Sequence, residues 1–132
     1  MPLGNRWHWY NENKQMKIYG LTTCRTTQKA LAWFKLHGIS NDFQNFKKTG
    51  VAKEKLQEWD WKQGYEVFLN KKGLTWKKLD PEIKAGINNS EMALALLQQQ
   101  PGIIKRPVIE DGDFLFFGFD EKVYEDHFLS LT

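Results

Sequence analysis

The sequence contains a single cysteine, Cys24, among its 132 residues. One cysteine cannot close a disulfide within the chain or supply a cysteine-rich zinc site. The sequence also has no window near the ~20 consecutive apolar residues that a membrane-spanning helix requires. Since it shows no secretory signal pattern either, we expect a protein of the reducing cytoplasm that does not bind membranes.

The net charge is small, and metal-binding side chains are scarce. The formal net charge is only +3 and the charges are evenly spread, so we expect no direct binding of nucleic acid. The three histidines, His8, His37 and His127, lack the spacing of metal ligands, so we expect no metal. The sequence shows no glycine-rich phosphate loop and no Ser/His/Asp arrangement.

The composition, with 41% hydrophobic and 27% charged residues, is typical of one globular domain with a sizeable core. Residues 1–15 differ from the rest because they are polar and irregular. We expect them to be an N-terminal extension, either poorly ordered or an artefact of cloning or of the gene model. The folded domain is expected to span residues 16–132.

The domain is expected to begin with a strand, a helix and a second strand. Ile18 and Tyr19 favour a strand, and residues 20–23 a short turn. The apolar spacing over residues 28–37 predicts a helix, and residues 42–46 read as the next strand. These elements form a βαβ unit.

The middle of the chain is predicted to be helical. The main helices are expected over residues 53–62 and 92–99, the second capped by Asn89 or Ser90, with two shorter pieces between them. The tryptophans could offer a stacking surface for bases. Three of them occupy apolar helix positions, however, which favours core packing: Trp33, Trp59 and Trp76.

The end of the chain returns to strands. Residues 107–110 and 114–117 are expected to pair around an Asp-Gly turn, and Asp120 to cap a last helix. The order is therefore βαβ, several helices, then ββα. It predicts an α/β fold with a mixed four-stranded sheet, helices on its faces and a helical insertion.

Cys24 is predicted to follow a strand and to begin a helix. The first turn of a helix presents unpaired N–H groups and partial positive charge, which stabilise a thiolate. Arg25 adds a neighbouring cation, and the Thr27 hydroxyl lies within reach of the sulfur. A lone cysteine is more often an inert core residue. The polar flanks of Cys24 favour an exposed, reactive thiol instead.

A second candidate element is Lys105-Arg106-Pro107, directly before a predicted strand. A proline there can be cis and mark a specific structural feature. Taken alone, the segment reads equally as solvated charges beside an ordinary trans proline.

Together these segments resemble the arsenate-reductase/Spx family, and within it the YffB-like branch. The matching pieces are IYGLTTC (18–24), QKALAW (28–33), FLNKKG (68–73), TWKKL (75–79), IIKRPVIE (103–110) and GFDE (118–121). The resemblance implies a thioredoxin-like fold with a helical insertion. It also implies that Cys24 is the nucleophile, facing Arg106, and that Arg106 precedes a cis Pro107. Such a guanidinium would favour the thiolate and bind an anion or a glutathione carboxylate.

The sequence departs from the family at three positions. Asn70 and Gly118 stand where glutathione-dependent arsenate reductases have two oxyanion-binding arginines. Losing two of three guanidinium contacts should weaken oxyanion binding, so arsenate is not the expected substrate. Thr27 stands where Spx-type regulators carry the second cysteine of their Cys-x-x-Cys switch.

Two functions remain open at this stage. The first is a glutathione-dependent monothiol reductase, with Cys24 and Arg106 as catalytic residues and glutathione as co-substrate. Its substrate contacts would come from six residues: Thr23, Arg25, Thr27, Asn70, Lys71 and Pro107. The second is a non-catalytic, Spx-like adaptor that binds a protein partner such as RNA polymerase.

Overall fold

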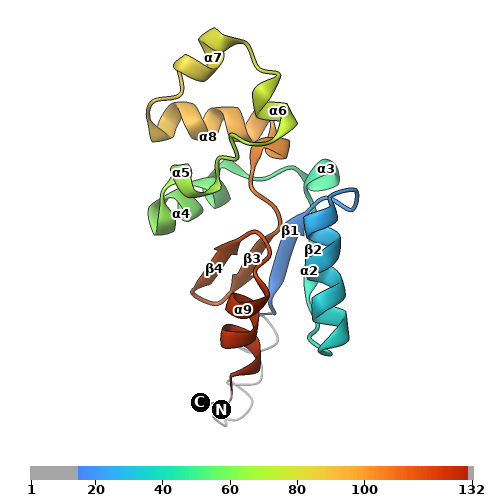
Figure 1. Ribbon diagram of the computed structural model, residues 1–132. Helices are drawn as coiled ribbons and strands as arrows, with labels where there is room; N and C mark the ends of the chain where they lie inside the picture. The colour runs from blue at the N-terminus through green and yellow to red at the C-terminus, as the bar shows by residue number, and fades with distance from the viewer. Residues whose placement is uncertain (1–14, 131–132) are drawn as a thin grey trace. The chain divides into compact units, whose positions relative to one another are not determined.

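The computed structural model describes residues 15–130 (Figure 1). The expected N-terminal extension lies outside the described residues except for Gln15. The chain divides into two compact units. The sheet unit comprises the described residues up to Gln44 and from Arg106 onward, and the helical unit comprises Asn45–Lys105.

The sheet unit is built on four strands in the order β2-β1-β3-β4. These are β1 (Lys17–Gly20), β2 (Asp42–Asn45), β3 (Val108–Asp111) and β4 (Phe114–Phe117). β3 pairs antiparallel with both β1 and β4, and Ile18 lies opposite Ile109. The predicted α/β fold with a mixed four-stranded sheet is confirmed.

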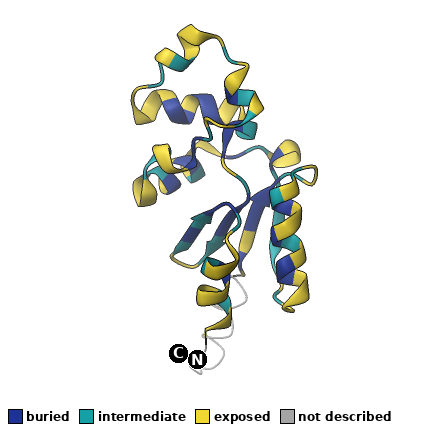
Figure 2. Cartoon of the chain, viewed as in Figure 1, coloured by how far each residue is buried: buried dark blue, intermediate teal, exposed yellow. Residues whose placement is uncertain are grey.

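The core of the sheet unit lies between the sheet and helix α2 (Arg25–Leu36). Buried and exposed residues alternate along α2 in Figure 2, as its amphipathic spacing predicts. Trp33 and Phe34 pack with Ile18, Ile109 and Tyr124 in one apolar cluster. The helix begins three residues before the predicted residue 28. Its polar first turn gave no apolar signal to mark it.

The C-terminal part of the sheet unit closes this core. Helix α9 (Glu121–Tyr124) is capped by Asp120, whose carboxylate accepts a hydrogen bond from the Val123 N–H at 3.2 Å, as predicted. It continues as one π-helical turn, Glu125–Leu129. The buried hydroxyl of Tyr124 donates to the Gly118 carbonyl at 2.6 Å. This bond ties α9 to the segment after β4.

The helical unit is the predicted insertion. Its elements are α3 (Phe46–Thr49), α4 (Lys53–Gln63), α5 (Tyr65–Phe68), α6 (Leu74–Lys77), α7 (Pro81–Ala85), α8 (Ser90–Gln99) and the 3-10 turn η1 (Pro101–Ile103). α4 packs against α8. The Trp59 ring meets Phe68 edge-on, with ring centroids 6.0 Å apart. Asn89 caps α8 by accepting from the Met92 N–H at 2.9 Å, as predicted.

The three tryptophans predicted to pack in the core do so. Trp33, Trp59 and Trp76 are buried in the cores of their units, as expected. Trp61, in the same helix as Trp59, is instead 85% exposed. It lies only two residues after Trp59, about 200° around the helix, so the two rings cannot share one buried face.

Candidate functional site

Cys24 is held at the junction between β1 and α2. Its N–H donates to the Leu21 carbonyl at 3.0 Å, and its carbonyl accepts from the Gln28 N–H at 3.0 Å. The Gln28 side chain also donates to the Thr22 carbonyl at 2.6 Å. Cys24 is thus the N-cap residue of α2, with a half-buried thiol, which confirms its predicted place at the start of a helix.

Thr27 lies in the first turn of α2 and is completely buried. Its hydroxyl has no hydrogen-bond partner among residues 15–130. A buried hydroxyl without a partner is costly, on the order of 1–3 kcal/mol. The hydroxyl and the backbone N–H of Thr27 nevertheless act on Cys24, because both lower the pKa of its thiol.

Arg106 approaches the same thiol from the other end of the sequence. It is half-buried and precedes Pro107, and the peptide bond between them is cis, as the resemblance implies. Pro107 lies directly before β3, and its carbonyl accepts a hydrogen bond from the Gly118 N–H at 2.7 Å. The Arg106 guanidinium donates a hydrogen bond to Cys24.

These neighbours make Cys24 an acidic thiol. Burial by itself raises the pKa of Cys24, but the polar groups of Thr27 and then the guanidinium of Arg106 outweigh it. Together they lower the pKa from its ordinary value of 9.0 to about 7. About half of the molecules therefore carry a thiolate, the nucleophilic form, near neutral pH.

Arg106→Ala is expected to raise the pKa of Cys24 because it removes both a hydrogen-bond donor and a positive charge. Well below the pKa, each unit of increase lowers the thiolate fraction about tenfold. We expect alkylation by iodoacetamide at pH 6 to slow roughly three- to tenfold, and the pH profile of the rate to move to higher pH. Lys105→Ala, which removes a neighbouring exposed charge, is the matched control. Equal profiles for wild type and Arg106→Ala would show that Arg106 does not act on the sulfur.

The other predicted contact residues are placed differently. Thr23 and Arg25 flank Cys24 and are exposed, and neither is among the groups that shift its pKa. Their role in substrate binding stays a prediction. Asn70 and Lys71 belong to the helical unit, where they line a pocket.

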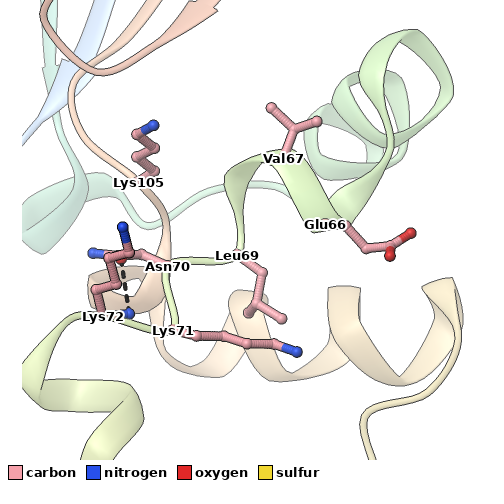
Figure 3. A pocket seen from close by; sticks show the side chains of 7 residues that line it. All are labelled: Glu66, Val67, Leu69, Asn70, Lys71, Lys72 and Lys105. Atoms are coloured by element: carbon pink, nitrogen blue, oxygen red, sulfur yellow. Dashed lines mark hydrogen bonds between the residues drawn. The ribbon is translucent and has the colours of Figure 1, made fainter.

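The pocket of the helical unit has a volume of about 430 Å³ (Figure 3). Two chain segments build it through an antiparallel bridge between Leu69 and Ile104. The Asn70 N–H donates to the Ile103 carbonyl, and the Lys105 N–H donates to the Phe68 carbonyl, both at 2.8 Å. The bridge brings Lys105 to the pocket that Asn70 also lines. The lining residues are Glu66, Val67, Leu69, Asn70, Lys71, Lys72 and Lys105.

The charge of this pocket favours an anion. Three lysines and a single carboxylate, that of Glu66, line it, and in the described part of the chain none of the three lysines forms a salt bridge. Lys71 lies over the Trp76 ring, 5.5 Å from its centroid, and extends away from Lys72 in Figure 3. No local sequence pattern marks Lys105 as a pocket residue. Only its pairing with a segment more than 30 residues earlier reveals that position.

Residues 15–130 contain no cluster of three or more potential metal ligands. Within the same range, no helix has the length and apolar character needed to cross a membrane.

Comparison with known proteins identifies the family. Residues 19–127 match the model of the ArsC family, which is most of the chain and includes Cys24 and Arg106. The chain belongs to the ArsC family. The resemblance inferred from the sequence is thereby confirmed.

Relatives of this ArsC-family chain are similar over nearly its whole domain. An uncharacterised protein of Haemophilus influenzae is 35% identical over 112 residues, or 84% of this chain and 96% of the relative. The solved structure of a YffB protein is 35% identical, with a TM-score of 0.79 over 83% of this chain and 95% of its own. The global transcriptional regulator Spx of Listeria innocua is 24% identical over 79% of each chain.

Proposed function

We propose that this protein is a glutathione-dependent monothiol reductase. The observation that carries the proposal is the thiol of Cys24, whose pKa is lowered to about 7 by Thr27 and Arg106. A thiol that titrates near ambient pH combines a large thiolate fraction with high nucleophilicity, which is the optimum for thiol–disulfide exchange.

The proposed reaction exchanges disulfides in two steps. The Cys24 thiolate attacks the glutathione sulfur of a mixed disulfide between glutathione and a substrate thiol. This forms a Cys24–glutathione disulfide, and the substrate leaves as a thiolate that takes up a proton. A second glutathione, as thiolate, attacks the glutathione sulfur of the adduct, which yields glutathione disulfide and returns the Cys24 thiolate. One glutathione thiol is oxidised for each substrate thiol released.

External glutathione is needed because the chain has no second cysteine to resolve the adduct. Arg106 would stabilise the thiolate both before the attack and as the leaving group of the second step. Lys71 and Lys72 would attract the carboxylates of glutathione, and Asn70 is a further proposed contact. Thr23, Arg25 and Pro107 are the remaining proposed contacts.

Mass spectrometry of the intact protein tests this proposal. After incubation with glutathione disulfide, we expect one glutathione adduct per chain, located on Cys24 by peptide mapping. Excess reduced glutathione should remove it within minutes, faster than it removes an adduct from the urea-unfolded protein. Failure to form the adduct in the folded protein, or an adduct that glutathione does not reverse, would contradict the proposal.

The similarity to Spx regulators supports a second candidate, an adaptor that binds a protein partner. The reductase is favoured because an adaptor has no need of an acidic thiol beside a guanidinium. Arsenate is not favoured as the substrate. Gly118 has no side chain to bind an oxyanion, and Asn70 offers an uncharged amide in place of a guanidinium, with its oxygen accepting from the Lys72 N–H at 3.1 Å.

A further inference from the structure

Gly20, the last residue of β1, lies unusually close to the first turn of α2. A Cβ atom at this position would lie 2.7 Å from the Thr27 hydroxyl oxygen and 2.8 Å from the Thr27 methyl carbon. Carbon atoms do not approach other heavy atoms this closely without a shift in structure. The backbone of Gly20 does not have a positive φ, so the glycine is not needed for its conformation. What requires it is the close approach of the strand to Thr27.

The approach matters because of what Thr27 does. Its side chain is completely buried in the first turn of α2, which Cys24 begins, and its hydroxyl has no hydrogen-bond partner among the described residues. No hydrogen bond therefore fixes this hydroxyl, which lowers the pKa of Cys24, and its position depends on the packing around it. A rotation of Thr27 about χ1 by one rotamer would carry the hydroxyl away from the sulfur.

We infer that Gly20 is a positioning residue of the Cys24 site: its missing side chain leaves the space that the Thr27 side chain occupies in the helical turn that Cys24 begins. The inference rests on the proposed function only in taking the Cys24 thiolate as the reacting species. Gly20 touches neither the substrate nor the sulfur and acts through Thr27.

A double-mutant cycle on the thiol pKa tests this inference. The four proteins are wild type, Gly20→Ala, Thr27→Val and the double variant, and Arg106 is present in all of them. Thr27→Val keeps the shape of the side chain and removes its hydroxyl. The readout is the pH dependence of Cys24 alkylation by iodoacetamide in the folded proteins, with folding checked by circular dichroism.

Both single variants are expected to move the alkylation profile to higher pH, with at least a threefold slower rate at pH 6. The double variant is expected to match Thr27→Val, because Gly20→Ala has no hydroxyl left to displace. Gly86→Ala is the matched control, since a Cβ there meets nothing closer than 3.5 Å. It should leave the profile unchanged.

Two results would overturn the inference. One is a folded Gly20→Ala protein with the wild-type profile. The other is an equal shift from Gly20→Ala in the wild-type and Thr27→Val backgrounds, which would show an effect that does not pass through the hydroxyl. If Gly20→Ala does not fold, the Thr27→Ser protein is compared with and without Gly20→Ala. Thr27→Ser keeps the hydroxyl and removes the methyl group, which is one of the two atoms that a Cβ at residue 20 would clash with. The cycle uses no glutathione, so its failure is distinguishable from failure of the adduct experiment.

Discussion

Cys24→Ser is expected to reduce glutathione-dependent disulfide reduction to the uncatalysed rate. The serine hydroxyl does not ionise near neutral pH and forms no disulfide, so neither step of the proposed reaction can proceed. No other thiol can replace it, because Cys24 is the only cysteine of the chain. The measurement is NADPH consumption with glutathione, glutathione reductase and a mixed disulfide of glutathione and 2-mercaptoethanol.

The control for this variant is its stability. The thiol of Cys24 is half-buried and sits at a helix N-cap, a position where serine is well accepted. The urea midpoint of Cys24→Ser should therefore stay close to that of wild type. Turnover that persists in the folded Cys24→Ser protein would refute the reductase proposal. If wild type also shows no turnover, the adaptor is the better hypothesis.

Trp59→Ala is expected to cause the largest loss of stability, about 3–5 kcal/mol in the free energy of unfolding. Trp59 is completely buried in the helical unit, where α4 packs against α8 and the indole meets Phe68 edge-on. Truncation removes these contacts and leaves a cavity that the short surrounding helices can fill only in part. Urea unfolding followed by circular dichroism measures the loss.

Trp61→Ala is the matched control because it makes the same substitution two residues away in the same helix. Trp61 is 85% exposed, so we expect a change within about 0.5 kcal/mol. Similar losses in the two variants would mean that Trp59 does not form the core of the helical unit. A large loss for Trp61→Ala alone would contradict the orientation of α4.

The features that the sequence predicted well are those with local causes. The caps Asn89 and Asp120 lie one turn before the N–H groups that they satisfy, so their effect is visible within four residues of sequence. The position of Cys24 at a helix start follows from the strand, turn and helix signals around it. Arg106 as its partner came from the family resemblance, since nothing near Arg106 in the sequence points to residue 24.

The features that the sequence missed depend on contacts between distant residues or on the rotation of a helix. Trp61 shares its residue type and helix with Trp59, and only the direction of each side chain separates core from surface. The lysine pocket needs the bridge between Leu69 and Ile104. The role of Gly20 depends on the close approach of its backbone to Thr27, where an added Cβ would lie 2.7 Å from the hydroxyl oxygen, and no pattern of residue types encodes this approach.

In the proposed exchange with glutathione, the absence of a second cysteine at Thr27, where it would complete a Cys-x-x-Cys motif, also determines how the oxidation of Cys24 depends on the glutathione pool. Oxidation of a dithiol by glutathione disulfide releases two glutathione molecules, so its equilibrium depends on the square of the glutathione concentration. A single cysteine exchanges one glutathione disulfide for one glutathione. Its degree of oxidation therefore follows the ratio of the two species and is unaffected when the whole pool is diluted or concentrated. A change in cell volume at constant ratio would shift a dithiol switch and leave Cys24 as it was.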